Sequence, residues 1–246
     1  MRYFQPAYPW LKRILPDGMV IPSGTIITGP GGSGKLLVGA AFVTAWLKQG
    51  GNLVLILANA TKEYTEQTLA LFDLDASQYQ DRILFAELHP DIDGVEVRQD
   101  NRIGINLVIP ENWDALQEAA HRRLPETSLG TLYFGAALNL LLFLDTYRDA
   151  IMGKLTSFLQ KNSTIFAVSN NVMKQAVRRL EETADNVMFS RTDREMQLYL
   201  KILRMKGVPF QTTEIAVPLP REELRRMRNA AEKHRKELIT AIRNVQ

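Results

Sequence analysis

One short segment, GTIITGPGGSGKLLVGAAF at residues 24–42, restricts the fold of this chain more than any other. It has the spacing G-x-x-x-x-G-K between a short β-branched run and a run rich in alanine and leucine. Glycines allow consecutive backbone N–H groups to converge on one anion, and a helix that follows adds free amides and its dipole. The segment therefore predicts a phosphate-binding loop between a strand and a helix.

The predicted site consists of the loop and the first residues of the helix after it: Gly29, Pro30, Gly31, Gly32, Ser33, Gly34, Lys35 and Leu36. The side chain of Lys35 is a point charge that reaches the terminal phosphates of a nucleotide. Leu36 departs from the usual pattern, in which a serine or threonine supplies a hydroxyl to Mg²⁺. An ordinary glycine-rich turn between a strand and a helix is the alternative interpretation.

Apolar runs and helical patterns alternate along most of the chain. Strands are expected at 25–28, 52–58, 82–88, 131–136 and 163–170, and helices at 35–48, 62–72, 111–123, 140–160 and 172–182. This alternation predicts an α/β fold in which helices cover both faces of a mainly parallel, twisted sheet.

Two parts of the chain interrupt the alternation. Residues 89–110 are polar and rich in turn-forming residues, so we expect a long loop there. Short β segments at 186–190, 196–204 and 210–217 are separated by turn-like sequences, which predicts antiparallel strands added at one edge of the sheet.

Composition excludes several classes of site. The 246 residues are 46% hydrophobic and contain no cysteine, which rules out disulfides and thiolate metal sites and fits a reducing compartment. The three histidines lack metal-ligand spacing. The longest apolar run, 132–144, is interrupted by Asn139 and is too short to span a bilayer. We expect a cytoplasmic protein with no membrane partner.

The basic character of the chain belongs to its C-terminal segment. Residues 221–246 contain eight Lys and Arg against four Glu, whereas the rest of the chain contains 22 basic and 23 acidic residues. Pro220 and the glutamates after it favour the start of a helix. An apolar stripe follows at spacings of three and four: Leu224, Met227, Ala231, His234, Leu238, Ala241 and Val245. This helix could pack on its own domain, form a coiled-coil or subunit contact, or touch nucleic acid or lipid.

Two stretches resemble RecA-superfamily ATPases of the KaiC and RadA type. PWLKRILPDGMVIPSGTIITGPGGSGK is similar to their leader, first strand and P-loop, and TADNVMFSRTDREMQLYLKILRMKG to a later segment of the family. The resemblance implies a RecA-like nucleotide-binding domain over 1–218, with 1–23 as leader and 219–246 as a basic amphipathic helix. It also implies ATP or ADP as ligand, and a homo-oligomer or related RecA-like subunits as partners.

Three elements of the family's catalytic machinery are changed in this sequence. Leu36 offers no oxygen to Mg²⁺, the acidic pair after the second strand falls on Asn59 and Ala60, and the Walker B aspartate falls at Gly135. Phosphoryl transfer depends on the metal and on positioned charge for nearly all of its acceleration. We therefore expect hydrolysis to be absent or very slow, and nucleotide binding to depend weakly on Mg²⁺.

Other residues are candidates to compensate. Glu63 and Glu66 could replace the missing acids, although exposed carboxylates at the start of a helix are the simpler interpretation. In KaiC-like proteins a basic pair reaches the γ-phosphate of a neighbouring subunit, and Arg204 and Lys206 occupy those positions with the residue types exchanged. A basic turn at the end of an edge strand is the alternative. Asp145, the next acid after the Walker B strand, is expected inside a helix.

The function predicted from these features is nucleotide binding by a regulatory or scaffolding protein with impaired or absent hydrolysis. One alternative is a functional ATPase that works in an oligomer with relocated acids. Another is a recombinase paralogue that binds DNA through its basic tail, although no aromatic and basic groove pattern supports nucleic acid as a partner. A third is a structural relic whose loop binds nothing.

Overall fold

The computed structural model describes residues 2–58, 60–98 and 100–230. Its strands are β1 (Arg2–Phe4), β2 (Met19–Ile21), β3 (Gly24–Gly29), β4 (Asn52–Leu57), β5 (Ile83–Leu88), β6 (Val95–Val97), β7 (Arg102–Ile105), β8 (Thr131–Ala136), β9 (Ser163–Ser169), β10 (Asn186–Thr192), β11 (Leu198–Arg204) and β12 (Ile215–Ala216). Its α-helices are α1 (Pro9–Ile14), α2 (Lys35–Lys48), α3 (Lys62–Ala70), α4 (Asn112–Arg123), α5 (Arg148–Lys161) and α6 (Lys174–Thr183), and its 3₁₀ helices are η1 (Ala76–Tyr79) and η2 (Leu138–Phe143). Residues 221–230 form a further helical segment.

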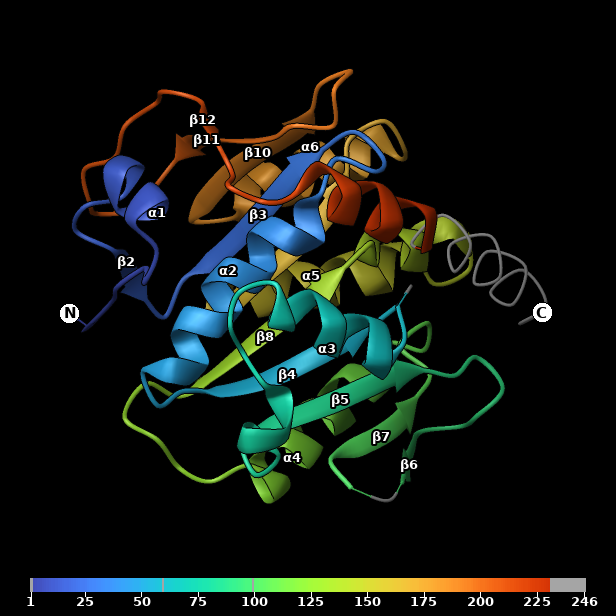
Figure 1. Cartoon of the computed structure of the whole chain (residues 1–246). Coiled ribbons are helices and arrows are strands. Elements are labelled where there is room, and N and C mark those ends of the chain that lie inside the picture. Colours follow the sequence, from blue (N-terminus) through green and yellow to red (C-terminus); the bar gives the residue numbers. More distant parts are fainter. Residues whose placement is uncertain (1, 59, 99, 231–246) are drawn as a thin grey trace.

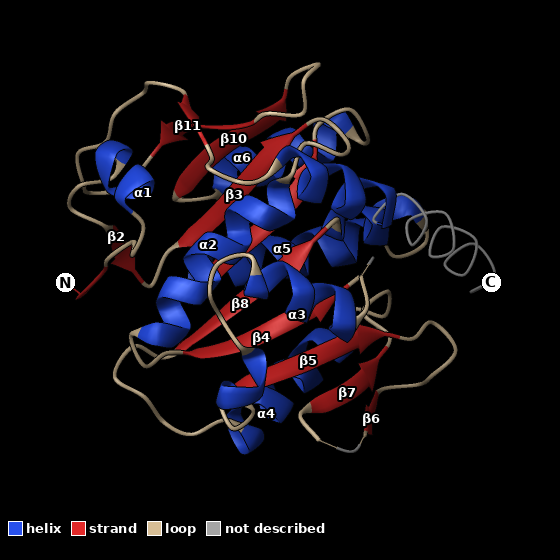
Figure 2. Cartoon of the chain, in the orientation of Figure 1, coloured by secondary structure: helices blue, strands red, loops and turns tan. Residues whose placement is uncertain are grey.

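One large sheet organises the described chain, with the strand order β12-β11-β10-β3-β9-β8-β4-β5-β7-β6. Figures 1 and 2 show α2 and α3 on the near face and α4, α5 and α6 on the far face. The central strands β10, β3, β9, β8, β4 and β5 are mutually parallel. The expected α/β architecture with helices on both faces is therefore present.

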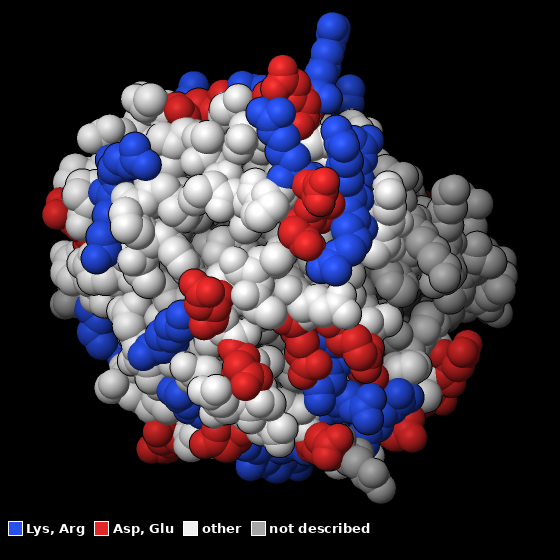
Figure 3. All heavy atoms as spheres, viewed as in Figure 1, with Lys and Arg blue, Asp and Glu red and all other residues white. Residues whose placement is uncertain are grey.

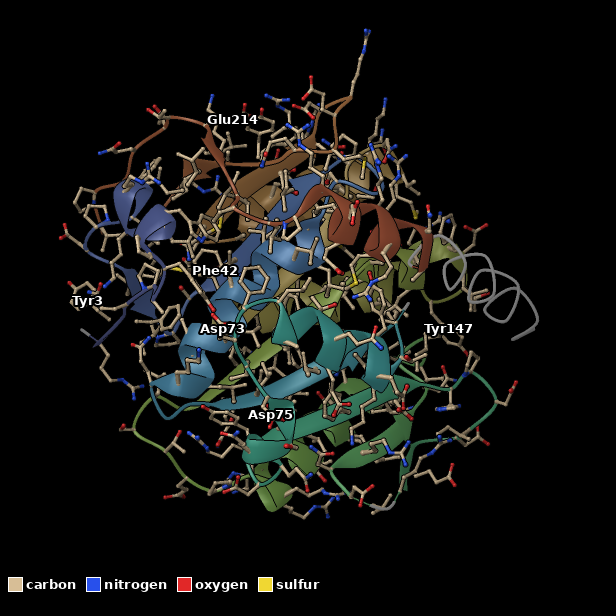
Figure 4. The ribbon with its side chains drawn as sticks, in the orientation of Figure 1. Tyr3, Phe42, Asp73, Asp75, Tyr147 and Glu214 are labelled. Carbon is tan, nitrogen blue, oxygen red and sulfur yellow. The ribbon has the colours of Figure 1, made fainter. Side chains whose placement is uncertain are left out.

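Two apolar layers account for this arrangement. Every residue of β4 is buried, as expected for a parallel strand covered on both faces. On the near side α2 is buried almost all round, and Phe42, labelled in Figure 4, is fully inaccessible between the helix and its neighbours. On the far side Trp113 of α4 packs against Phe158 of α5, with ring centroids 5.0 Å apart.

The expected loop at 89–110 is wrong in part, because it contains β6 and β7. Strand β7 pairs in parallel with β5, with Arg102 opposite Phe85, and β6 returns antiparallel to it. Strand β6 is three residues long and half-exposed to exposed, so it lacks the apolar alternation that indicates a strand. Main-chain pairing to the neighbouring strands defines these edge elements.

The expectation that all the late β segments are antiparallel edge additions is also wrong. Strand β10 pairs in parallel with β3, with Asn186 opposite Thr25, and therefore lies beside the strand that leads into the glycine-rich loop. Only β11 and β12 are antiparallel additions, and β12 is limited to two residues of the expected range 210–217. The direction of β10 is set by the crossover through α6. The length of the strand alone does not reveal this direction.

The helix expected at 140–160 is divided in two. Buried leucines form η2, a turn follows at 145–147, and α5 begins only at Arg148. Asp145 lies in that turn, where its carboxylate pairs with the Arg148 guanidinium, and not inside a helix as expected. The Arg148 Nε also donates to the carbonyl of Leu142 at 2.9 Å, which ends the 3₁₀ turn with a side-chain contact.

The leader contains a second, two-stranded sheet, in which β1 and β2 pair antiparallel, and its apolar side chains join the near-side core. It is attached to the rest of the chain by hydrogen bonds from the Tyr8 hydroxyl to the Phe72 carbonyl (2.7 Å) and from the Gln211 amide to the Ile14 carbonyl (2.9 Å). Across the described ranges, no helix combines the length and apolarity needed to cross a bilayer.

The contact between α2 and β8 should be sensitive to a single methyl group. A Cβ placed on Gly39 of α2 would lie 2.3 Å from the buried Phe134 ring. Overpacking of this kind costs about 1–3 kcal/mol, more than the roughly 0.5–1 kcal/mol that Ala gains over Gly in a helix. We therefore expect Gly39→Ala to lower the urea unfolding midpoint.

Gly153→Ala is the matched control, because Gly153 lies in α5, is exposed, and has nothing within 4 Å of its Cβ position. This substitution should raise the midpoint slightly through helix propensity. An equal or higher midpoint for Gly39→Ala than for Gly153→Ala would contradict the close packing of α2 on β8.

Candidate phosphate-binding site

The glycine-rich loop lies where the carboxyl end of β3 meets the amino end of α2. Gly32 and Gly34 adopt φ of +72° and +70°, a conformation that glycine adopts without steric cost. Gly29 approaches β10 so closely that a Cβ there would lie 2.1 Å from the Ser190 carbonyl oxygen. The positions of these three glycines are thus required by backbone geometry.

Lys35 folds back over this loop. Its Nζ donates hydrogen bonds to the carbonyls of Gly29 (3.1 Å) and Pro30 (2.5 Å) and to the Ser33 Oγ (3.1 Å). Burial lowers the pKa of the Lys35 ammonium from 10.5 to about 8. The ammonium is therefore held in the loop by neutral acceptors, without a charged partner among these contacts.

The segment after β9 supports the loop from the other side. The Gly31 amide donates to the Asn171 Oδ1 at 3.2 Å, and the Ser169 hydroxyl donates to the same oxygen. The Asn170 amide donates to the Gly29 carbonyl at 3.1 Å. The side-chain oxygen of Asn171 thus accepts a hydrogen bond from a loop N–H group that could otherwise bind an anion.

A cavity of about 340 Å³ opens beside the loop, within the size range of small-molecule sites. It lies at the carboxyl ends of β3, β8 and β9, the usual position of ligand sites in open α/β sheets. Its wall is completed by Tyr64 of α3, by Thr192 and Met196 near the β10–β11 turn, and by the helical segment 221–230. Lys35 and Arg228 are the only charged residues in the described wall, which contains no acid.

Asn139 belongs to the wall of this cavity and carries a buried side-chain donor. Its side chain is 1% exposed, and its Oδ1 accepts a hydrogen bond from the Ser169 amide at 3.2 Å, which fixes the orientation of the carboxamide. The Nδ2 group has no hydrogen-bond partner among the described residues. Ala137, two residues before it, adopts φ of +58°, a costly conformation for a residue other than glycine. The Asn139 Nδ2 group is itself inaccessible, so it lies behind the surface of the cavity wall.

The described wall fits phosphate better than it fits a metal. Leu36 lines the cavity with an apolar side chain, and the end of β8 contributes Ala136 and Ala137 where a Walker B carboxylate was sought. Gly135 itself is not in the wall. Across the described ranges, no group of three His, Asp or Glu side chains is placed to hold a metal ion. Phosphate oxygens would meet N–H donors and positive charge here.

The candidate replacement acids lie elsewhere. Glu63 is exposed in the first turn of α3, where its own backbone N–H and the Thr61 hydroxyl lower the pKa of its carboxyl. Glu66 pairs with Lys62 at 3.8 Å. Neither glutamate lines the cavity. Asn59 is outside the described residues, and Ala60 packs half-buried against the near-side core.

Arg204 and Lys206 lie near the opposite end of the sheet from the loop. Arg204 is opposite Val187 at the start of β10, whereas the loop follows the end of the parallel strand β3. Its guanidinium donates to the Ala184 carbonyl at 2.6 Å, and the Lys206 Nζ pairs with Asp185 at 2.9 Å. Neither residue reaches the site of its own chain, so the expected contact with a neighbouring subunit stays a prediction.

Sequence reasoning did not identify Asn171, Asn139 and Arg228 as parts of this site. The only signal was Asn139, a polar residue inside the apolar run 132–144. Asn171 has no recognisable motif, and Arg228 is one of several arginines in a basic segment. Their proximity to the loop depends on tertiary packing.

The lowered pKa of Lys35 is directly measurable. An NMR titration of the lysine side chains, with the Lys35 signal assigned through Lys35→Arg, should show deprotonation near pH 8 because burial disfavours the charged form. Inorganic pyrophosphate should raise this pKa, and its affinity should fall as the pH rises above 8, because the neutral amine offers no charge. A Lys35 pKa at its ordinary value near 10.5 would show that the ammonium is hydrated.

No protein-family model matches the chain, and no curated protein matches it in sequence. Solved structures match it in fold. The KaiC-like protein PH0186 from Pyrococcus horikoshii OT3 has a TM-score of 0.67 at 14% identity, over 89% of this chain and 96% of its own. The flagellar accessory protein FlaH from Methanocaldococcus jannaschii has a TM-score of 0.63 at 11% identity, over 87% and 94%. The predicted RecA-like fold of the KaiC type is thereby confirmed for this chain.

Proposed function

We propose that this chain binds ATP or ADP through the β3–α2 loop, hydrolyses ATP very slowly or not at all, and acts as a regulatory or scaffolding subunit. The observation that carries the proposal is the composition of the cavity. A complete G-x-x-x-x-G-K loop borders a described wall that contains a lysine and an arginine but no carboxylate.

Binding follows from the charge and the donors of the loop. The amino end of α2 directs its free N–H groups and the positive end of its dipole toward the loop. Lys35 is desolvated and is held only by neutral oxygen atoms in the contacts described above. An anionic phosphate would compensate that desolvation, so exchange of the loop carbonyls for phosphate oxygens is favourable.

Slow hydrolysis follows from the groups that are missing from the described wall. Water attack on a phosphoryl group requires a base or a residue that orients the water, together with a metal that neutralises the developing charge. Leu36, Ala136 and Ala137 occupy the wall where such groups would act, and none of them has a polar side chain. Bound nucleotide would therefore persist and set conformation or assembly.

The partners we propose are further copies of this chain or related RecA-like subunits. One of the structures with the same fold is named an accessory protein, and an accessory role within a larger assembly suits a subunit that binds nucleotide without consuming it. Arg204 and Lys206 are exposed on the side away from the loop, where such a neighbour would meet them. Figure 3 shows Lys and Arg interspersed with Asp and Glu on the viewed face, which gives a DNA-binding alternative no support there.

Calorimetry with ATP and ADP, in Mg²⁺ and in EDTA, tests the proposal. We expect the same affinity in both conditions, because no wall carboxylate holds a metal, and at least a tenfold loss in Lys35→Ala, since hydrogen bonds to charged groups contribute about 1.5–3 kcal/mol. Lys48→Ala is the matched control, because Lys48 is exposed at the far end of the same helix and should leave affinity unchanged.

Two results would contradict the proposal. Turnover that requires Mg²⁺ and disappears in Lys35→Ala would establish an ATPase with relocated acids. No retention of either nucleotide at millimolar concentration would establish the loop as a structural relic.

A further inference from the structure

The wall of the cavity on its C-terminal side is packed into the core. Figure 1 draws the helical segment 221–230 in red beside the amino end of α2. Leu224 and Met227, the first two members of its apolar stripe, are each 3% exposed, and the Tyr64 hydroxyl of α3 donates to the Met227 carbonyl at 2.9 Å. Of the contacts expected for this helix, packing on its own domain is therefore present over 221–230. The members of the stripe from Ala231 onward lie outside the described residues.

The loop side of the cavity is different, because a single exposed contact closes it. Gly31 of the loop and Asn171 after β9 are both exposed, and the Gly31 amide donates to the Asn171 Oδ1 at 3.2 Å. An N–H group requires an acceptor, so the carboxamide oxygen and not its nitrogen faces the loop. The Ser169 hydroxyl donates to the same oxygen and holds it there.

This contact uses a donor that a phosphate group would also use. A backbone N–H group has one proton to donate, so the Asn171 Oδ1 and a phosphate oxygen are alternative acceptors for the Gly31 amide. A charged acceptor forms a shorter and stronger hydrogen bond than a neutral carboxamide does. A phosphate can therefore displace the Asn171 oxygen, but it must break the existing hydrogen bond first.

The loop can also release Lys35 to a ligand without leaving an acceptor unsatisfied. The Gly29 carbonyl accepts a second hydrogen bond at 3.1 Å from the chain after β9, and the Pro30 carbonyl accepts one at 3.3 Å from the Ser33 amide. The Ser33 Oγ lies 3.2 Å from the Ser190 Oγ. Each acceptor of the ammonium thus keeps another partner, which avoids the cost of a buried unpaired group. The contact that opposes the ligand is the one made by Asn171.

We propose that Asn171 is an internal competitor of the ligand: its carboxamide oxygen closes the loop by occupying the Gly31 amide, and phosphate oxygens displace it when they bind. This inference rests on the proposed function, because it concerns the same loop. When only a fraction of the molecules is open, the apparent affinity for the ligand falls by that fraction. Asn171 therefore raises the nucleotide concentration at which a regulatory subunit responds.

Calorimetry on the full chain, with ADP and with inorganic pyrophosphate in EDTA, tests this assignment. Asn171→Ala should tighten the binding of both ligands about three- to tenfold, the size expected when one competing neutral hydrogen bond is lost. Asn162→Ala is the matched control. Asn162 precedes the opposite end of β9, and its Oδ1 also accepts one side-chain hydrogen bond, from the Gln117 Nε2 at 3.3 Å. This control should leave both affinities unchanged.

The amide of Gly31 gives a second measurement that requires no ligand. In amide hydrogen exchange followed by NMR, Asn171→Ala should speed the exchange of the Gly31 N–H group, because water replaces its protein acceptor. Pyrophosphate should then slow this exchange again. An exchange rate of Gly31 that is the same in wild type and Asn171→Ala would overturn the inference, since the closing contact would not be formed in solution.

The outcomes distinguish the two proposals. Unchanged or weaker binding in Asn171→Ala, with ADP binding that requires Lys35, would overturn this inference and leave the proposed function intact. Tighter pyrophosphate binding in Asn171→Ala, without ADP binding to either protein, would support the inference and overturn the proposed function. No binding of either ligand to either protein would overturn both. The urea midpoint of Asn171→Ala should stay near the wild-type value because the residue is exposed, which separates ligand binding from folding.

Discussion

The burial of Lys35 in the turn between β3 and α2 is the interaction on which the rest of the site depends. A lysine ammonium is costly to desolvate, and among the described residues it donates to two loop carbonyls and a serine hydroxyl. These acceptors satisfy the hydrogen-bonding capacity of the ammonium, but they are neutral and do not compensate its charge. An anion would be a better partner, because it compensates the charge as well as the hydrogen bonds.

The surrounding strands hold this turn in place with main-chain and carboxamide contacts. The chain leaving β9 supports the loop through Asn170 and Asn171, and β10 approaches Gly29 too closely to admit a side chain. The carboxyl end of β8, where a metal-dependent enzyme of this architecture would carry an acid, is lined by alanines. The described wall of the cavity therefore carries two basic side chains and no carboxylate, which is the basis of the proposal that it binds an anion.

The local sequence was most informative where the chain is buried on both faces. The helix expected at 35–48 begins and ends where expected, and β8 at 131–136 does as well. Both are apolar segments whose sequence pattern is dictated by burial. The edges were predicted poorly, because β6 and β7 are short and β6 is half-exposed to exposed, and because the direction of β10 depends on a crossover and not on its own residues.

The sequence by itself determined the glycine-rich loop between β3 and α2 and the alternation that makes an α/β sheet, and it placed Leu36 and Gly135 where the resemblance implies a hydroxyl and a carboxylate. These are local properties, since backbone conformation and residue chemistry are set within a few positions of each other. Only the tertiary structure decided that Asn139, Asn171 and Arg228 converge on the loop from three distant parts of the chain. The physical reason is that η2 packs in the far-side core and the helical segment 221–230 in the near-side core, while β9 contributes to both. The packing of both layers on one sheet brings these polar residues together, and no local sequence pattern specifies that proximity.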